Sequence, residues 1–360
     1  MKSLSFYPGP SKVYPEIEAF MNEAFEDGIL EQNHRSEAFM ALLKDTLDTL
    51  KKRLDIPEDY HVFFTSSATE CWEISTQSLI RGKAQFLYSG AFGKKWFKYA
   101  VTNPQINPTE KYPKPVLRGS RFFEDQEAAT VEIDPENDLL CLVDNETSNG
   151  TQINTENLEK LRRLNPSAVL MVDATSSFGG VAHDFALADV WFASVQKCLG
   201  MPSGMSIMLV SPKAIALARE VNERNHYNSL LNILENFDQY QTHYTPNILS
   251  IFLLKRLNHI LPSIGEIDKK TKARAADFYA FIKNETTFDL VVSNENTRSD
   301  TVFAIKSDPE QLKVLKGKAK EQGIILGNGY GEWKENSFRI ANFPAITDED
   351  FDRLKNVLRS

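Results

Sequence analysis

Lys197 stands where an apolar run, ADVWFASV, gives way to a loop rich in small residues. If the run is a strand, the strand ends close to this lysine, in a place that is partly shielded from water. Shielding lowers the pKa of an amine and lets it form a Schiff base with a carbonyl cofactor. Most lysines at such turns are ordinary surface residues, so this chemistry needs support from other positions.

Asp173 gives that support, because it ends another apolar run, SAVLMVD. A carboxylate at the end of a buried strand can pair with the pyridinium nitrogen of pyridoxal phosphate, which keeps the ring an acceptor of electrons. An aspartate before Thr-Ser-Ser is also a common turn or capping residue. Together, Lys197 and Asp173 favour a pyridoxal-phosphate site.

The segment FFTSSATECWEISTQSLIRG has the pattern of a strand, a polar turn and a helix. Ser67 and Glu70 have the spacing of a capping box. The free N–H groups and the positive dipole end of such a helix attract a phosphate, and the hydroxyl of Thr69 can add a bond. A plain helix cap has the same pattern, so this segment alone says little about function.

Two further residues could bind a ring and a carboxylate. Phe92 lies between small residues after a predicted strand, where its ring can lie flat against a cofactor, although most aromatics in such places are core residues. Arg339 alternates with Phe338 and Ile340 in a predicted strand and therefore points to the opposite face. Such an arginine usually faces solvent, but in a cleft its planar guanidinium binds an α-carboxylate through two hydrogen bonds.

These residues need a sheet that brings the ends of several strands together. From His61 onward, apolar runs alternate with helical stretches, which predicts an α/β fold with a mainly parallel sheet and helices on both faces. Ligands bind at the carboxyl ends of the strands in such sheets. Past about Thr245 the pattern changes to longer helices and short strands. We expect a large domain over 15–245 and a smaller α+β domain over 246–360, packed with the N-terminal segment 1–14.

Composition excludes several classes of function. The net charge of -8 gives no general basic surface, so we expect no nucleic acid partner. Three scattered cysteines, Cys71, Cys141 and Cys198, predict neither a disulfide framework nor a metal site and fit a reducing cytoplasm. The sequence has no signal-peptide pattern and no apolar run near the ~20 residues that span a bilayer. We therefore expect a cytoplasmic protein without a membrane partner.

Taken together, these motifs resemble the class V branch of the fold-type I pyridoxal-phosphate enzymes, and within it the phosphoserine aminotransferases. The similarity covers nearly the whole chain through FYPGPSKVYP, NHRSEAF, SGAFGKKW, NETSNG, VDATSS, SVQK, YTPN and FRIANFPA. It implies a seven-stranded, mainly parallel sheet in the large domain and a homodimer with active sites at its interface. It also implies a ping-pong transaminase of serine biosynthesis that converts 3-phosphoserine and 2-oxoglutarate to 3-phosphohydroxypyruvate and glutamate.

The resemblance assigns roles to individual residues. Lys197 would form the Schiff base and carry the proton, Asp173 would hold the pyridinium nitrogen, and Phe92 would stack on the ring in place of the usual tryptophan. The remaining implied contacts are Thr147 with the ring hydroxyl, Ala68, Thr69 and Gln196 with the phosphate, Tyr244 and Thr245 with the phosphate in the neighbouring subunit, Arg339 with the substrate carboxylate, and His34 and Arg35 with the distal anion of the substrate.

One stretch departs from the phosphoserine aminotransferase pattern. That family has a His-Arg pair shortly before the carboxylate arginine, whereas this chain reads GNGYGEWKENSFR. The carboxylate of Glu332, next to Trp333, would repel a substrate phosphate. The stretch is closer to alanine- or serine-glyoxylate aminotransferases, which leaves a small unphosphorylated amino donor as the alternative substrate.

Two other classes of protein fit the sequence less well. A cysteine desulfurase needs a nucleophilic cysteine in the C-terminal half, but no cysteine follows Cys198, and Gln196 stands where desulfurases carry histidine. A cofactor-binding relative without turnover would have no need to keep Lys197, Asp173 and Arg339 together.

Overall fold

The computed structural model describes residues 3–103 and 115–359, and its largest element is a sheet of seven strands. The strand order is β2-β10-β9-β8-β5-β3-β4. Neighbouring strands are parallel except at β10, which is antiparallel to β2 and to β9. The predicted α/β fold with a mainly parallel seven-stranded sheet is therefore confirmed. The strands are β2 (His61–Thr65), β3 (Lys83–Tyr88), β4 (Val116–Arg121), β5 (Leu139–Val143), β8 (Val169–Asp173), β9 (Val190–Ser194) and β10 (Ser206–Val210).

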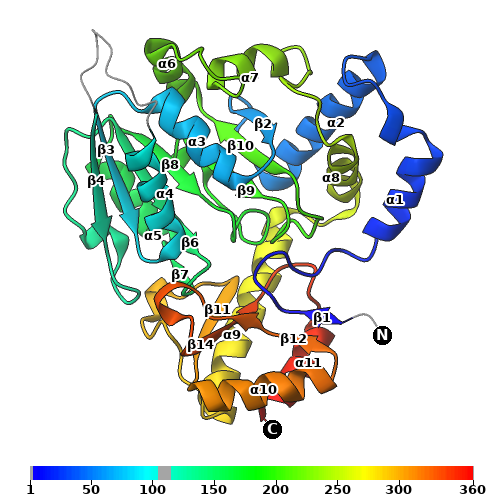
Figure 1. Ribbon diagram of the computed structural model, residues 1–360, viewed down its shortest axis with the longest axis vertical. Coiled ribbons are helices and arrows are strands. Elements are labelled where there is room, and N and C mark those ends of the chain that lie inside the picture. Colours follow the sequence, from blue (N-terminus) through cyan, green and yellow to red (C-terminus); the bar gives the residue numbers. More distant parts are fainter. Residues whose placement is uncertain (1–2, 104–114, 360) are drawn as a thin grey trace.

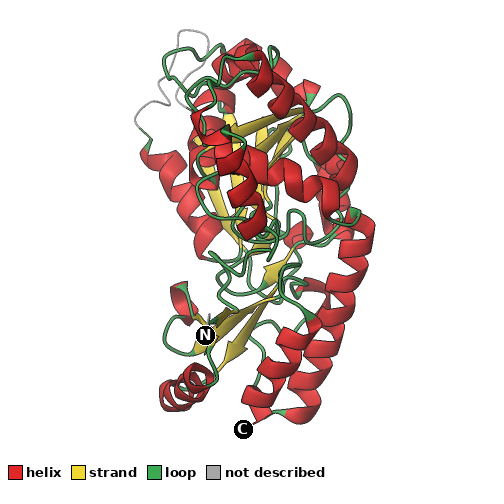
Figure 2. Cartoon of the chain, turned by 90° about the vertical axis from the view of Figure 1, so that its right-hand side faces the viewer, coloured by secondary structure: helices red, strands yellow, loops and turns green. Residues whose placement is uncertain are grey.

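Helices cover both faces of this sheet, as Figure 2 shows for the upper body of the molecule. The strands β5, β8, β9 and β10 are consequently buried at every position, and their sequences are continuous apolar runs. The helices of this body are α1 (Ile17–Glu26), α2 (Glu37–Leu54), α3 (Ala68–Leu79), α4 (Ala91–Thr102), α5 (Thr155–Leu164), α6 (Pro212–Val221), α7 (Leu230–Phe237) and α8 (Ile248–Ile260).

A smaller body holds a three-stranded antiparallel sheet in the order β11-β14-β13 (Figure 1). The first strand of the chain, β1 (Leu4–Ser5), pairs in parallel with β12 (Ile324–Ile325). The N-terminal segment therefore lies against elements from the other end of the sequence. The elements of this body are α9 (Ile264–Glu285), β11 (Val302–Lys306), α10 (Pro309–Glu321), β13 (Gly327–Asn328), β14 (Ser337–Ala341) and α11 (Asp348–Arg359). In the larger body, a short hairpin of β6 (Asn145–Glu146) and β7 (Thr151–Gln152) follows β5.

The apolar side chains form two main cores. The first runs from Tyr14 to Ile267, also contains Ala345, and includes all of the buried apolar residues of α8. The second combines Leu4 and Phe6 with buried apolar residues of α9 from Ala275 onward, of α10 and α11, and of the small sheet. The division into domains at residue 245 stays a prediction, and residues 1 and 2 of the predicted N-terminal segment lie outside the described part of the chain. Among the described helices, none has both the length and the apolar character required to cross a membrane.

Candidate active site

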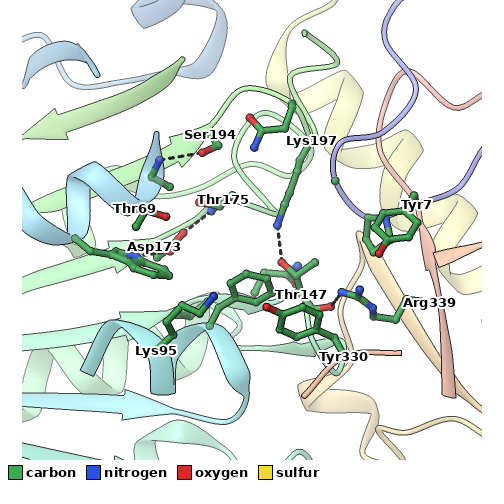
Figure 3. Close-up of a pocket in the computed structure, with 18 of the residues that line it drawn as sticks. Tyr7, Thr69, Lys95, Thr147, Asp173, Thr175, Ser194, Lys197, Tyr330 and Arg339 are labelled. Carbon is green, nitrogen blue, oxygen red and sulfur yellow. Dashed lines mark hydrogen bonds between the residues drawn. The ribbon is translucent and has the colours of Figure 1, made fainter. Parts of the chain in front are cut away.

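The carboxyl ends of β5, β8 and β9 open into a cavity of about 290 Å³ (Figure 3). This volume is near the lower end of the range for small-ligand sites. The position agrees with the rule that open α/β sheets bind ligands beyond the carboxyl ends of their strands. Most of the predicted site residues line the cavity, namely Ala68, Thr69, Phe92, Thr147, Asp173, Gln196, Lys197 and Arg339.

The amine of Lys197 points into this cavity from the loop after β9. Its Nζ donates a hydrogen bond of 2.7 Å to Oγ1 of Thr147 and lies 5.4 Å from the centre of the Phe92 ring. Burial lowers the pKa of the amine to about 8, although the nearby Asp173 carboxylate acts in the opposite direction. About a tenth of such amines carry no proton at pH 7 and can attack a carbonyl carbon.

The carboxylate of Asp173 lies at the end of β8 and is 3% exposed. Its Oδ2 accepts a hydrogen bond of 2.8 Å from Nε1 of Trp72, and its Oδ1 accepts one of 2.9 Å from the backbone N–H of Thr175. Burial raises the pKa of the carboxyl, while these donors and the nearby Lys197 oppose the rise. A cationic ring nitrogen is the kind of partner that such a buried carboxylate favours.

Helix α3 begins at the cavity. The hydroxyl of Ser67 accepts a hydrogen bond of 3.1 Å from the backbone N–H of Glu70, so the predicted cap is present. The predicted capping box is wrong in its second half, because the Glu70 carboxylate accepts from the backbone N–H of Ser66, at 2.7 Å, and not from Ser67. The backbone N–H of Ala68 donates to the Ser194 hydroxyl at 2.9 Å. This helix start presents its positive end to the cavity.

Arg339 reaches the cavity from β14 of the smaller body and is 3% exposed. Its neighbours Phe338 and Ile340 are buried in the second core, as the alternation in the sequence predicts. Nε donates to the carbonyl of Asn328 at 2.7 Å, and Nη1 donates to the carbonyl of Thr147 at 2.8 Å. These bonds fix the guanidinium and leave Nη2 without a hydrogen bond to the described residues, available for an anion.

Some lining residues escaped the sequence analysis: Tyr7, Pro8, Gly9, Trp72, Lys95, Tyr99, Val143, Asn145, Thr175, Ser194 and Tyr330. Helical spacing could have found a few of them. Trp72 lies one turn after Thr69, and Lys95 lies one turn after Phe92. The contribution of Gly9 could not be found in this way, because no local spacing connects the N-terminal segment to Lys197.

Four predicted residues lie outside the cavity of their own chain. Arg35 is exposed and donates a hydrogen bond of 3.2 Å to Oδ1 of Asn236, and His34 precedes it in the loop before α2. Tyr244 is half-buried and Thr245 is exposed, and both precede α8. Their predicted roles toward the cofactor phosphate and the distal anion of the substrate stay predictions.

Glu332 lies in a short 3₁₀ turn, Gly331–Trp333, in the stretch that departs from the expected pattern. Its carboxylate accepts two hydrogen bonds from Arg121 at the end of β4, of 3.1 and 2.7 Å. This ion pair offsets the negative charge that was expected to repel a phosphate. Tyr330, the residue before this turn, stacks on Phe92 with ring centres 5.1 Å apart and planes 9° apart.

These groups fit pyridoxal phosphate. The amine of Lys197, with its lowered pKa, suits the aldehyde of this cofactor, and the buried carboxylate of Asp173 suits its pyridine nitrogen. The N-terminus of α3 suits the phosphate, and the ring of Phe92 suits the aromatic ring. The hydroxyl of Thr175 also lines this cavity and is buried without a hydrogen-bond partner among the residues that the structure describes, as expected of a site built for a polar ligand.

Comparisons with known proteins agree with this reading of the cavity. A model of the aminotransferase class-V family matches residues 7–331. The chain is 28% identical to a phosphoserine aminotransferase of Rhodococcus opacus, over 96% of this chain and 91% of that protein. It is similar to the crystal structure of a phosphoserine aminotransferase from Cytophaga hutchinsonii, with a TM-score of 0.89 and 29% identity over 99% of this chain and 98% of that one. An alanine-glyoxylate aminotransferase from Nostoc sp. shares the fold, with a TM-score of 0.79 and 18% identity over 100% of this chain and 95% of that one.

Proposed function

Because the chain belongs to the class V aminotransferases, a family of transaminases that use pyridoxal phosphate, we propose that it is a phosphoserine aminotransferase. The proposed reaction transfers the amino group of 3-phosphoserine to 2-oxoglutarate and yields 3-phosphohydroxypyruvate and glutamate. The enzyme would then serve serine biosynthesis.

The observation that carries a transaminase function is the convergence of Lys197, Asp173 and Arg339 on one cavity. When bound, pyridoxal phosphate supplies an aldehyde that condenses with amines and a ring that withdraws electrons from the substrate Cα. Arg339 binds the substrate carboxylate and fixes its orientation. Lys197 Nζ, with a pKa of about 8, would be suited to take a proton from the substrate Cα and to deliver it to the carbon on the other side of the amino nitrogen, a 1,3 proton transfer.

A phosphorylated substrate is supported by the two relatives of 28% and 29% identity, which are phosphoserine aminotransferases and match almost the whole chain. It is also supported by Arg121, because this residue neutralises Glu332 beside the cavity. Lys95 lines the cavity itself and supplies a further positive charge there (Figure 3). A dianionic phosphate would be attracted by these cations.

We further propose a cytoplasmic homodimer in which each subunit completes the other's site. Tyr244 and Thr245 would bind the cofactor phosphate of the partner subunit, and His34 and Arg35 would reach the distal anion of the substrate. Both ring nitrogens of the adjacent His243 are buried without a hydrogen-bond partner in the described single chain, which suits a segment completed by another subunit. The three cysteines are free and buried, as is usual in a reducing compartment.

An unphosphorylated donor, as in alanine- or serine-glyoxylate aminotransferases, remains the second candidate. One observation favours it: the turn before Arg339 holds Glu332 and Trp333, where a His-Arg pair was expected from the phosphoserine enzymes, and the residue before this turn, Tyr330, lines the cavity. A substrate phosphate would therefore depend on cations from other parts of the protein.

A comparison of amino donors tests these alternatives. Phosphoserine, serine, alanine and glutamate are each mixed with the purified holoenzyme, and the loss of the cofactor's visible absorption is followed without an acceptor. We expect kcat/KM for phosphoserine to exceed that for serine on the order of 100-fold or more, because charged groups of the site would otherwise stay unpaired. A preference for serine or alanine would overturn the phosphoserine assignment, and no absorption change with any donor would overturn the transaminase.

A further inference from the structure

Trp72 connects helix α3 to the end of strand β8. Its indole Nε1 donates a hydrogen bond of 2.8 Å to Oδ2 of Asp173, and its side chain lines the active-site cavity. Trp72 is 4% exposed, so this bond is shielded from water. A hydrogen bond to a carboxylate in such surroundings is stronger than one between neutral groups.

Asp173 has donors on both of its oxygens. The backbone N–H of Thr175 binds Oδ1 and fixes that oxygen from the chain's own turn. Trp72 binds Oδ2 from another element, so the two donors together set the rotation of the carboxylate about its last bond. A carboxylate held in this way keeps the direction of its remaining lone pairs.

The indole of Trp72 is itself held by aromatic neighbours on α4. Its ring stacks on Trp96, with centres 6.3 Å and planes 10° apart, and meets Tyr99 at 5.9 Å and 64°. The packing of its ring therefore fixes the direction of the Trp72 N–H, which points at the Asp173 carboxylate. In contrast, Nε1 of Trp96 is buried and has no hydrogen-bond partner in the described residues.

We propose that Trp72 is a positioning residue for Asp173, whose indole N–H keeps this carboxylate ionised and aimed at the pyridine nitrogen of the cofactor. The inference rests on the proposed role of Asp173. Burial penalises the charged carboxylate, and the Trp72 donor offsets part of that penalty. Without the donor, Asp173 would hold the proton on the ring nitrogen less firmly, and the ring would withdraw electrons less effectively.

The test compares Trp72→Phe with the matched variant Trp96→Phe in the holoenzyme. Both changes remove an indole from the same stack, but only the first removes a hydrogen bond to Asp173. We expect Trp72→Phe to slow the half-reaction with the best amino donor by roughly tenfold, since a hydrogen bond to a charged group has about this weight. Its KM for the donor should change little. Trp96→Phe keeps an aromatic ring against Trp72 and leaves the Trp72 N–H on Asp173, so it should react at nearly the rate of the unmodified enzyme.

The ¹⁵N chemical shift of ring-labelled pyridoxal phosphate bound to each variant gives a readout apart from turnover. We expect a protonated ring nitrogen in the unmodified enzyme and in Trp96→Phe, and loss of that proton at a lower pH in Trp72→Phe. Asp173→Asn separates two kinds of failure. If Asp173→Asn shifts the ring nitrogen but Trp72→Phe does not, the inference about Trp72 is overturned. If Asp173→Asn has no effect, the proposed role of Asp173 falls as well.

A smaller change covers the case in which Trp72→Phe does not fold. Benzothienylalanine at position 72 replaces the indole N–H by sulfur and keeps the two fused rings. We expect it to reproduce the slower half-reaction and the shifted ring nitrogen at an unchanged melting temperature. A rate and a ¹⁵N shift equal to those of the unmodified enzyme would contradict the inference.

Discussion

The amine of Lys197 differs from an ordinary lysine because its surroundings exclude water. Burial lowers its pKa to about 8, and the attraction of Asp173 recovers only part of the loss. The reactive form of an amine is the unprotonated one. A residue of this kind is prepared for condensation with a carbonyl group before any ligand arrives.

The capture of pyridoxal phosphate by the apoenzyme should therefore depend on pH. The rate is expected to rise tenfold per pH unit at low pH and to level off above about pH 8, because further deprotonation of Lys197 then adds little. Stopped-flow absorbance of apoenzyme mixed with the cofactor measures this rate. Lys197→Ala is the control and should give no covalent absorption band. A rate that still climbs at pH 10 would mean that the lysine is not shielded.

The sequence predicted which residues line the cavity best where one element carries both the residue and its pattern. Asp173 and Arg339 were found because each lies in a strand whose own apolar residues show its direction. The bond from Trp72 to Asp173 could not be predicted, because it depends on how α3 packs against β8. Helical spacing could place Trp72 near the cavity but could not show where its N–H points.

At the scale of elements, the N-terminal segment pairs with β12 and also contacts Lys197. Gly9 approaches Lys197 so closely that an added Cβ would lie 2.8 Å from Cε of the lysine. Its φ of +115° is also a conformation that other residues rarely adopt. Nothing in the local sequence indicates this contact, because the two positions are brought together by the fold alone.

Gly9→Ala should consequently weaken cofactor binding as well as stability. We expect a loss of about 1 to 3 kcal/mol of folding free energy from backbone strain and a displaced Lys197 that captures the cofactor more slowly. Gly28→Ala is the matched variant, since Gly28 has a φ of +66° but no atom within 4 Å of an added Cβ. Urea unfolding and cofactor titration of both variants measure the two effects. Equal cofactor affinities would show that the Gly9 contact is unimportant for Lys197.

At the scale of the whole molecule, the ion pair of Arg121 and Glu332 joins the large sheet to the smaller body. Arg121 ends β4, and Glu332 lies in the turn that leads to β14 and Arg339. Glu332 could be identified from the sequence but Arg121 could not, because an ion pair between two bodies has no signal in either segment. The fold was predictable because the alternation of strands and helices is visible within each segment. The contacts between the two bodies were not, because each joins residues from distant segments.

Glu332→Gln should leave the positive charge of Arg121 unbalanced. We expect kcat/KM for phosphoserine to rise severalfold relative to serine at low ionic strength, and the gain to shrink as salt screens the charge. Glu335→Gln is the control, because Glu335 lies two residues after this turn and, within the described part of the chain, its ion pair is with the exposed Lys334. Steady-state rates at two salt concentrations give the comparison. An equal change for both donors would argue against a phosphate on this side of the cavity.

The thiol of Cys198 follows Lys197 directly and is 1% exposed, with Sγ donating to the carbonyl of Ser176 at 3.2 Å. Burial raises its pKa far above that of a free thiol, so it is unreactive while the loop stays closed. A small alkylating reagent can reach it only when this loop opens. The rate at which Cys198 is alkylated therefore reports how often the loop at the cofactor attachment point opens. A bound molecule that stabilises this loop should lower the alkylation rate.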